Sequence, residues 1–548
     1  MTRADSYQYD GNGNLTQFTD RRGKIDGFTY DALNRRTFAG FGSSKKGWES
    51  TINYTYDAGS RLTQLVDSTA GTITRTYDNF DRLASETTPQ GSISYAYDAA
   101  GRRTGMTVAG QQAVNYSYDN ADRLSQISQL TTVVGFGYDV ASRRTSLTLP
   151  NGITVSYGYD DASRLTSMTY QLGQTQLGNL TYTYDNAGRL LARGGTWART
   201  NLPAAVASAT YDAANELTNW GGTSMSYDAN GNISSPAQHV TYTWNARNQL
   251  TSVPGATFQY DGFGRRQVRG TTSFLYDGLN PVQELSGSTV TANTLAGGLD
   301  EFFMRTDSGG ARSLLADLLG STLALTDNTG AVQTQYTYEP FGNTTFTGAS
   351  SASPFQFTGR ENDATGLYYY RARYYSPVFG RFISEDPIGF AGGSSDLYGY
   401  ALSSPTNLRD PSGRQAAAAV AAVPILDTGP FALLFVDLYL ARYDIGEAAK
   451  LYRSYFPPSP SPSPAAAPCC CPSPGPSPAP ARPAGGRKPS PSEGEDPNDP
   501  CKNSLIRCLE NPWQPSWNWD FGKRKDCGAC YRECKNAGGL WPTYKCPE

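Results

Sequence analysis

The sequence is short of the residues on which common catalytic mechanisms depend. Its 548 residues include one histidine, His239. A metal site built on a pair of histidines is therefore excluded, and a Ser–His–Asp or Cys–His mechanism would have to use His239. All nine cysteines lie at or after position 469. The first 468 residues must therefore be stabilised by packing without disulfides.

Charge and long apolar runs are scarce as well. Charged residues make up 17% of the chain, and the 46 Lys and Arg nearly balance the 49 Asp and Glu, so a chain-wide polyanion-binding surface is not expected. No apolar secretion signal follows Met1. The most apolar stretch, residues 416–440, is broken by prolines and aspartates into pieces too short to span a bilayer.

What the sequence has in abundance is glycine, tyrosine and one repeated unit. The unit is aromatic-x-Tyr-Asp, a few small polar residues, then Arg-Leu or Asn-Leu, as in residues 54–62 and 182–190. Most early copies are 20 or 21 residues apart. The aspartates of the copies are Asp10, Asp31, Asp57, Asp78, Asp98, Asp119, Asp139, Asp160, Asp185, Asp212, Asp228, Asp261 and Asp277.

Each copy predicts a β-hairpin. Alternating aromatics place one face of a strand in a shared core, and the aspartate caps a tight turn that leads to the return strand. One hairpin is marginal alone, so neighbours must stack into a long antiparallel sheet. Calcium sites along the aspartates are the alternative interpretation. Each copy offers one dependable carboxylate, too few ligands for calcium.

This unit resembles that of the RHS/YD-repeat family, which includes bacterial polymorphic toxins, the C component of insecticidal toxin complexes and the teneurin shell. The repeats cover residues 1–299. The resemblance implies an all-β fold in which the hairpins spiral into a hollow shell around the C-terminal part of the chain. About fourteen copies are few for a closed shell, so an open, curved sheet is the alternative.

Residues 300–414 resemble the RHS-associated core of the same family. The matching segments are 317–321, 336–343, 357–360, 366–375, 380–389 and 405–413. The last two contain a paired motif, Asp386-Pro-Ile-Gly and Asp410-Pro-Ser-Gly.

The paired motif has two interpretations. Asp-Pro-x-Gly is a good four-residue turn. Two carboxylates brought close cannot both ionise easily, so one can act as an acid and the other as a base, as in aspartyl proteases. Family members with this pair cut themselves just after the second copy. The resemblance therefore implies catalytic Asp386 and Asp410, with Arg373 or Arg381 in support.

The expected scissile bond is Arg414–Gln415. The family usually has leucine directly after the second motif, where this chain has Arg414.

The composition changes after residue 414. Residues 415–456 are Ala-rich with helical spacing, and residues 457–500 form a Pro/Ser-rich linker. The linker contains Cys469, Cys470 and Cys471, whose role stays open. Residues 501–548 form a small module with eight Lys and Arg against five Asp and Glu. Its cysteines are Cys501, Cys508, Cys527, Cys530, Cys534 and Cys546.

A module of this size needs disulfides or a bound metal to be stable. Three disulfides are the first expectation, zinc bound by the cysteines is the rival, and a redox Cys-x-x-Cys is a third alternative. No other cofactor is expected. In the family this position holds a variable effector.

We therefore predict part of a polymorphic toxin that encloses its own C-terminal segment and releases it by self-cleavage. An immunity protein and a secretion machinery are the expected partners, and nucleic acid or the target-cell surface the expected target. Secretion or surface display would use a route without a visible signal peptide, unless the chain is a truncated gene product. A cell-surface adhesion or carbohydrate-binding protein without cleavage is the alternative function, and an inactive cassette is a third.

Overall fold

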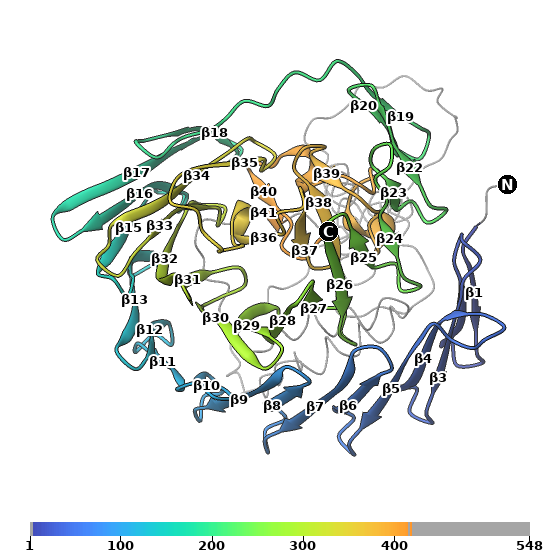
Figure 1. The fold of residues 1–548 in the computed structure, drawn as a ribbon. Coiled ribbons are helices and arrows are strands. Elements are labelled where there is room, and N and C mark those ends of the chain that lie inside the picture. Colours follow the sequence, from blue (N-terminus) through green and yellow to red (C-terminus); the bar gives the residue numbers. More distant parts are fainter. Residues whose placement is uncertain (1–3, 415–416, 419–548) are drawn as a thin grey trace, which may run out of the picture. The chain divides into compact units, whose positions relative to one another are not determined.

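The computed structural model describes residues 4–414 and 417–418, and they are almost entirely β-structure. Two long antiparallel sheets dominate, one of 18 strands and one of 12 strands. In each, every strand pairs with the next strand along the chain, and Figure 1 shows this order as a continuous change of colour. The predicted all-β fold of consecutive hairpins is confirmed.

The first sheet runs from residue 6 to residue 194. Its strands are β1 (Ser6–Tyr9), β2 (Leu15–Thr19), β3 (Ile25–Tyr30), β4 (Arg36–Ser43), β5 (Ser50–Tyr56), β6 (Leu62–Asp67), β7 (Gly71–Tyr77), β8 (Leu83–Thr88), β9 (Gly91–Tyr97), β10 (Arg103–Val108), β11 (Val114–Tyr118), β12 (Leu124–Gln129), β13 (Thr132–Tyr138), β14 (Arg144–Thr148), β15 (Ile153–Tyr159), β16 (Leu165–Leu172), β17 (Thr175–Tyr184) and β18 (Leu190–Gly194).

Two small sheets and the second long sheet follow. The small sheets are β19 (Ala209–Tyr211), β20 (Leu217–Trp220) and β21 (Thr223–Ser224), and then β22 (Ser226–Tyr227) and β23 (Ile233–Ser235). The long sheet comprises β24 (Thr243–Trp244), β25 (Leu250–Val253), β26 (Ala256–Tyr260), β27 (Arg266–Arg269), β28 (Thr272–Asp277), β29 (Asn280–Ser286), β30 (Thr289–Ala296), β31 (Phe302–Asp307), β32 (Gly310–Ala316), β33 (Thr322–Thr326), β34 (Val332–Tyr338) and β35 (Thr344–Gly348). This sheet continues without a break across residue 300, where the sequence places the start of the core.

The remaining elements are short. They are η1 (Phe357–Gly359), β36 (Glu361–Asn362), β37 (Tyr368–Tyr370), β38 (Arg373–Ser376), β39 (Arg381–Phe382), η2 (Gly389–Gly392), η3 (Ala401–Ser403), β40 (Leu408–Arg409) and β41 (Ala417–Ala418). No helix in the described part of the chain could cross a bilayer. The predicted helical segment, linker, cysteine-rich module and all nine cysteines lie outside the described residues, apart from the pair 417–418.

The repeat aspartate caps its turn as predicted. Asp57 Oδ1 accepts the backbone N–H of Arg61 at 2.9 Å, and Asp57 Oδ2 accepts Arg61 Nε at 2.6 Å. The guanidinium then lies 4.8 Å from the ring centroid of Tyr77 in the next repeat, and the Tyr77 hydroxyl donates to the carbonyl of Leu62 at 2.8 Å. Each turn is thus fastened to the next, which stacks the hairpins in register.

The two long sheets share a core. One cluster combines buried residues of β9–β17, such as Ile127 and Tyr170, with buried residues of β28–β33, such as Phe303 and Leu323. A second cluster joins strands β31–β34 to the short elements that follow, through residues such as Tyr370 and Tyr400. The short elements are therefore set in place by the strands that precede them in the chain.

Candidate active site

Both Asp-Pro-x-Gly segments form the predicted turns. Gly389 N–H donates to the Asp386 carbonyl at 2.9 Å, and Gly413 N–H donates to the Asp410 carbonyl at 3.4 Å. The Asp386 carboxylate also accepts the N–H of Ile388 at 3.0 Å. The first turn follows β39 and the second follows β40. The turn interpretation is thus correct, and it also fixes the direction of each carboxylate.

One buried guanidinium lies between the two carboxylates. Arg373 Nη2 is 2.9 Å from Asp386 Oδ2 and 3.3 Å from Asp410 Oδ2. The side chains of Arg373 and Asp410 are each 2% exposed, and that of Asp386 is 7% exposed. The structure thus brings together three of the residues singled out in the sequence.

The rest of the Arg373 guanidinium is also engaged. Its Nη1 donates to the Leu397 carbonyl at 2.8 Å, and its Nε donates to the Gly413 carbonyl. Its carbon lies 3.6 Å from the centroid of the Phe382 ring. Because the guanidinium is bound on every side, it cannot rotate. Arg373 therefore fixes the distance between the carboxylates of Asp386 and Asp410.

The expected scissile bond begins at this pair. Arg414 N–H donates to Asp410 Oδ1 at 3.1 Å. A Cβ added at Gly392 would lie 2.9 Å from the Arg414 carbonyl oxygen and 2.9 Å from Asp386 Oδ2, so the carbonyl and the Asp386 carboxylate face the same spot. A cavity of about 10 Å³ lies among Arg373, Asp386, Asp410 and Arg414, about the room that one water needs.

Burial favours the protonated form of Asp386. The pKa of Asp386 is raised to about 6: desolvation raises it most and the charge of Asp410 contributes to the rise, whereas Arg373, the Ile388 N–H and Arg414 lower it. Burial also lowers the pKa of Arg373, against the attraction of the two aspartates. Asp386 therefore carries its proton at a pH where an exposed aspartate has lost it.

Comparison with known proteins agrees with the fold. The family model of the teneurin YD-shell matches residues 134–391, and that of the RHS repeat matches residues 9–37, 56–93 and 77–113. The chain belongs to the RHS/YD-repeat family.

Its relatives in this family include toxins. Tse5, a toxin protein of Pseudomonas aeruginosa, is 37% identical over 117 residues, which are 21% of this chain and 8% of Tse5. WapA of Bacillus spizizenii, described as a tRNA3(Ser)-specific nuclease, is 29% identical over 254 residues, which are 43% of this chain and 11% of WapA. This RHS chain thus spans a small part of the length of either relative.

The solved structures give the same fold. A crystal structure of TcdB2-TccC3-TEV superposes with a TM-score of 0.61 at 17% identity, over 75% of this chain and 27% of the solved chain. At that identity the likeness concerns the fold alone. This chain thus has the fold of RHS-repeat shells, and toxins are among its relatives.

The second candidate arginine of this RHS chain lies elsewhere. Arg381 Nη2 binds Asp396 Oδ1 at 3.1 Å, and its guanidinium lies against the ring of Tyr398 at 4.8 Å. Asp396 lines the small cavity but Arg381 does not. His239 is exposed between β23 and β24, apart from the residues that line this cavity. Gln415 lies outside the described residues.

Two further groups contact the aspartate pair, and nothing in the sequence singles them out. The Leu397 carbonyl accepts both the N–H of Asp386 at 2.9 Å and Arg373 Nη1. The hydroxyl of Ser412 donates to Asp410 Oδ1 at 3.1 Å. The first is a backbone atom and the second occupies the variable position of the motif, so neither stands out as a residue type.

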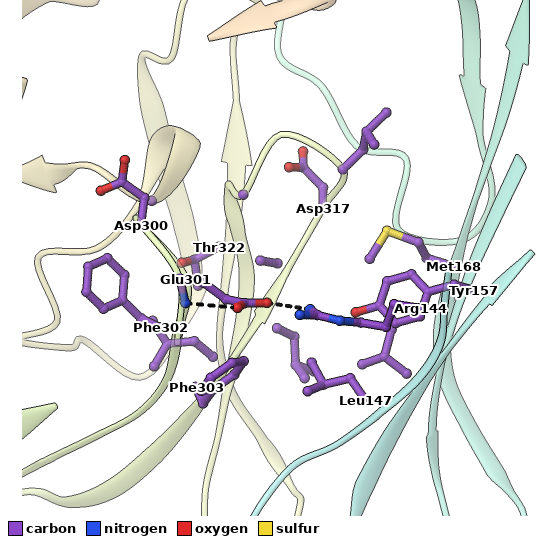
Figure 2. Close-up of a pocket in the computed structure, with 18 of the residues that line it drawn as sticks. Arg144, Leu147, Tyr157, Met168, Asp300, Glu301, Phe302, Phe303, Asp317 and Thr322 are labelled. Carbon is purple, nitrogen blue, oxygen red and sulfur yellow. Dashed lines mark hydrogen bonds and ion pairs between the residues drawn. The ribbon is translucent and has the colours of Figure 1, made fainter. Parts of the chain in front are cut away.

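A larger cavity of about 170 Å³ lies between β14–β16 and β31–β33. Figure 2 shows that the Arg144 guanidinium and the Glu301 carboxylate meet across it. The two remaining carboxylates of its lining are also paired, Asp300 with Arg360 at 2.5 Å and Asp317 with Arg193 at 3.2 Å. Each carboxylate of this cavity has an arginine of its own, whereas Asp386 and Asp410 share one, so the cavity is a weaker candidate for chemistry than the aspartate pair.

Proposed function

We propose that this chain is the shell and self-cleaving part of an RHS toxin, which holds residues 415–548 as cargo and cuts the Arg414–Gln415 bond. The observation that carries the proposal is the position of Arg373 Nη2 between Asp386 and Asp410, together with the Arg414 carbonyl oxygen, which faces the same spot as Asp386 Oδ2. If the two motifs were turns only, their buried carboxylates would not need to share the Arg373 guanidinium.

The geometry supports an aspartyl mechanism. Asp410 accepts hydrogen bonds from Arg373, Ser412 and Arg414 N–H, and these donors favour its ionised form, which suits a base. A water in the cavity transfers a proton to Asp410 and attacks the Arg414 carbonyl carbon. Protonated Asp386 donates its proton to the carbonyl oxygen.

The intermediate then collapses. The C–N bond breaks, the nitrogen of Gln415 takes the proton held by Asp410, and one hydroxyl of the diol returns its proton to Asp386. The new carboxyl group of Arg414 then remains with the shell. No ion or external cofactor is required in this scheme, because every proton transfer uses the aspartate pair.

The relatives support the cargo part of the proposal. Two of them are described as a toxin and a nuclease, and both extend far beyond the matched segment. We infer that residues 415–548 are a toxic effector, with an immunity protein for the producing cell and a delivery machinery as partners. The protein would then act outside the cell that makes it.

The test uses the full chain with a C-terminal tag and intact mass under denaturing conditions. Wild type should split between Arg414 and Gln415, while Asp386→Asn and Asp410→Asn should remain whole. Asp396→Asn is the matched control, because Asp396 lines the same cavity but binds Arg381. It should still be cut.

Each result has a clear meaning. If wild type and all variants stay intact while folded, the motifs are turns only, and the adhesion function gains weight. If Asp386→Asn and Asp410→Asn are cut like wild type, another group performs the cleavage and the aspartate mechanism is wrong.

A further inference from the structure

A charged contact ties the first hairpins of the chain to the residue next to Asp386. Arg21 lies in the turn between β2 and β3, and its Nη1 and Nη2 lie 3.0 and 2.5 Å from the two carboxylate oxygens of Glu385. The side chains are 29% and 16% exposed. The two residues are 364 positions apart. This is a bidentate, partly buried pair, the strongest form of such a contact.

A third segment closes around the same carboxylate. Arg21 Nη2 also donates to the Asn230 carbonyl at 2.8 Å, and a Cβ at Gly231 would lie 2.6 Å from Glu385 Oε1. The Tyr398 hydroxyl donates to the Gly231 carbonyl at 2.8 Å. The turn of residues 228–232 and Arg21 therefore hold Glu385 from two sides.

Glu385 and Asp386 bind different arginines. Glu385 pairs with Arg21, while Asp386 pairs with Arg373. The backbone between them is held through Asp386 N–H, which donates to the Leu397 carbonyl at 2.9 Å. A rotation of this segment that releases Glu385 would also turn the Asp386 carboxylate away from Arg373, because both side chains share one stretch of backbone.

We propose that Arg21 is a positioning residue for self-cleavage, so that the Arg414–Gln415 bond is cut only after the first hairpins have docked on Glu385. This inference rests on the proposed function and adds its regulation. It makes release of the cargo depend on the fold of residues far away in the chain. A chain whose first hairpins are missing or undocked retains its cargo covalently.

The experiment follows cleavage of the full chain during cell-free synthesis, with samples quenched over time. Arg21→Ala and Glu385→Ala should each slow the appearance of the two fragments about tenfold, within the usual range for coupled neighbours. The double variant should be no slower than either single variant. Arg21→Lys, which keeps the charge, should recover part of the rate.

A steric variant tests the same link without removing charge. Gly231→Ala places a methyl group against Glu385 and Tyr398, and it should slow cleavage as well. Gly13→Ala is its matched control, since Gly13 has a φ of 84° against 74° for Gly231 and open space around it. Arg35→Ala is the control for removing an arginine from a hairpin turn. Arg35 lies in the next turn and binds the aspartate of that turn, Asp31.

The outcomes separate this inference from the proposed function. If wild type is not cut, the proposed function fails and the inference with it. If wild type is cut and Arg21→Ala keeps the wild-type rate, the positioning role is wrong and self-cleavage stands. If Arg21→Ala and Glu385→Ala add their effects in the double variant, the two residues act separately and the inference is overturned. Melting of each variant in the uncut Asp410→Asn background shows whether its fold is retained.

Discussion

The protonation of Asp386 predicts how self-cleavage depends on pH. Burial raises the pKa of Asp386 to about 6, with Asp410 adding to the shift. The proposed mechanism needs the proton on Asp386, so the active fraction is full well below pH 6 and falls as the pH rises through 6. Cleavage should therefore be faster at pH 5 than at pH 8.

The size of the effect follows from one ionisation. At pH 8, two units above the pKa of Asp386, about 1% of the molecules carry the proton, against about 90% at pH 5. The cleavage rate should fall by about a hundredfold over this range.

A variant of Arg414 should shift the pH at which the cleavage rate is half-maximal. The charge of Arg414 lowers the pKa of Asp386, so Arg414→Gln should shift the midpoint of the pH profile upward. Asp396→Asn is the control, because Asp396 is bound to Arg381 and is not among the groups that shift the pKa of Asp386. Its profile should keep the wild-type midpoint.

The assay starts from full chain that was recovered uncut from inclusion bodies in urea, and follows its refolding into buffers from pH 5 to 8. Quenched samples are then separated by mass. Circular dichroism of uncut Asp410→Asn over the same range checks that the fold does not change with pH. A rate that is flat or rises between pH 5 and pH 8 would refute the role of Asp386 as proton donor.

Three further predictions concern the turn, the repeat and the cysteines. Gly413→Ala should slow or abolish cleavage in a folded protein, because Gly413 has a φ of 70° and a Cβ there would lie 2.1 Å from a backbone carbonyl oxygen. Its control is Gly152→Ala, which should be cut normally because Gly152 has a φ of 80° and no atom near the position of the added Cβ. Asp160→Ala should lower the melting temperature by about 2 °C, since its carboxylate caps a turn, whereas Asp161→Ala should leave it unchanged. Residues 501–548 should gain mass on reduction, as expected of disulfides; release of zinc by a chelator would contradict this.

The hairpins were predictable because the information for each is local. Asp160 and Arg164 are four residues apart, and the carboxylate receives both the N–H and the guanidinium of that arginine. The aromatic residues alternate along one strand, so burial follows from periodicity. Repetition of this unit also predicts neighbours, because one hairpin cannot bury its apolar face alone.

The candidate site was predictable only in part. The motif identifies Asp386 and Asp410, but it does not say which arginine reaches them. Arg373 opens β38 and Arg381 opens β39, and the pairing of these strands directs the first toward the aspartates and the second toward Asp396. That choice depends on strand register, which short strands of two to four residues do not reveal in the sequence.

The contact between Arg21 and Glu385 could not be predicted from sequence motifs. Arg21 belongs to a turn that looks like the other repeat turns, and Glu385 precedes the motif aspartate. Their meeting depends on how all the intervening strands are arranged, and neither residue has an unusual neighbour in sequence. The proposed self-cleavage would then depend on the whole fold. In the proposed mechanism, the segments around residues 21, 231, 373 and 410 are all in place before the carboxylates align, so that cleavage follows completion of the fold.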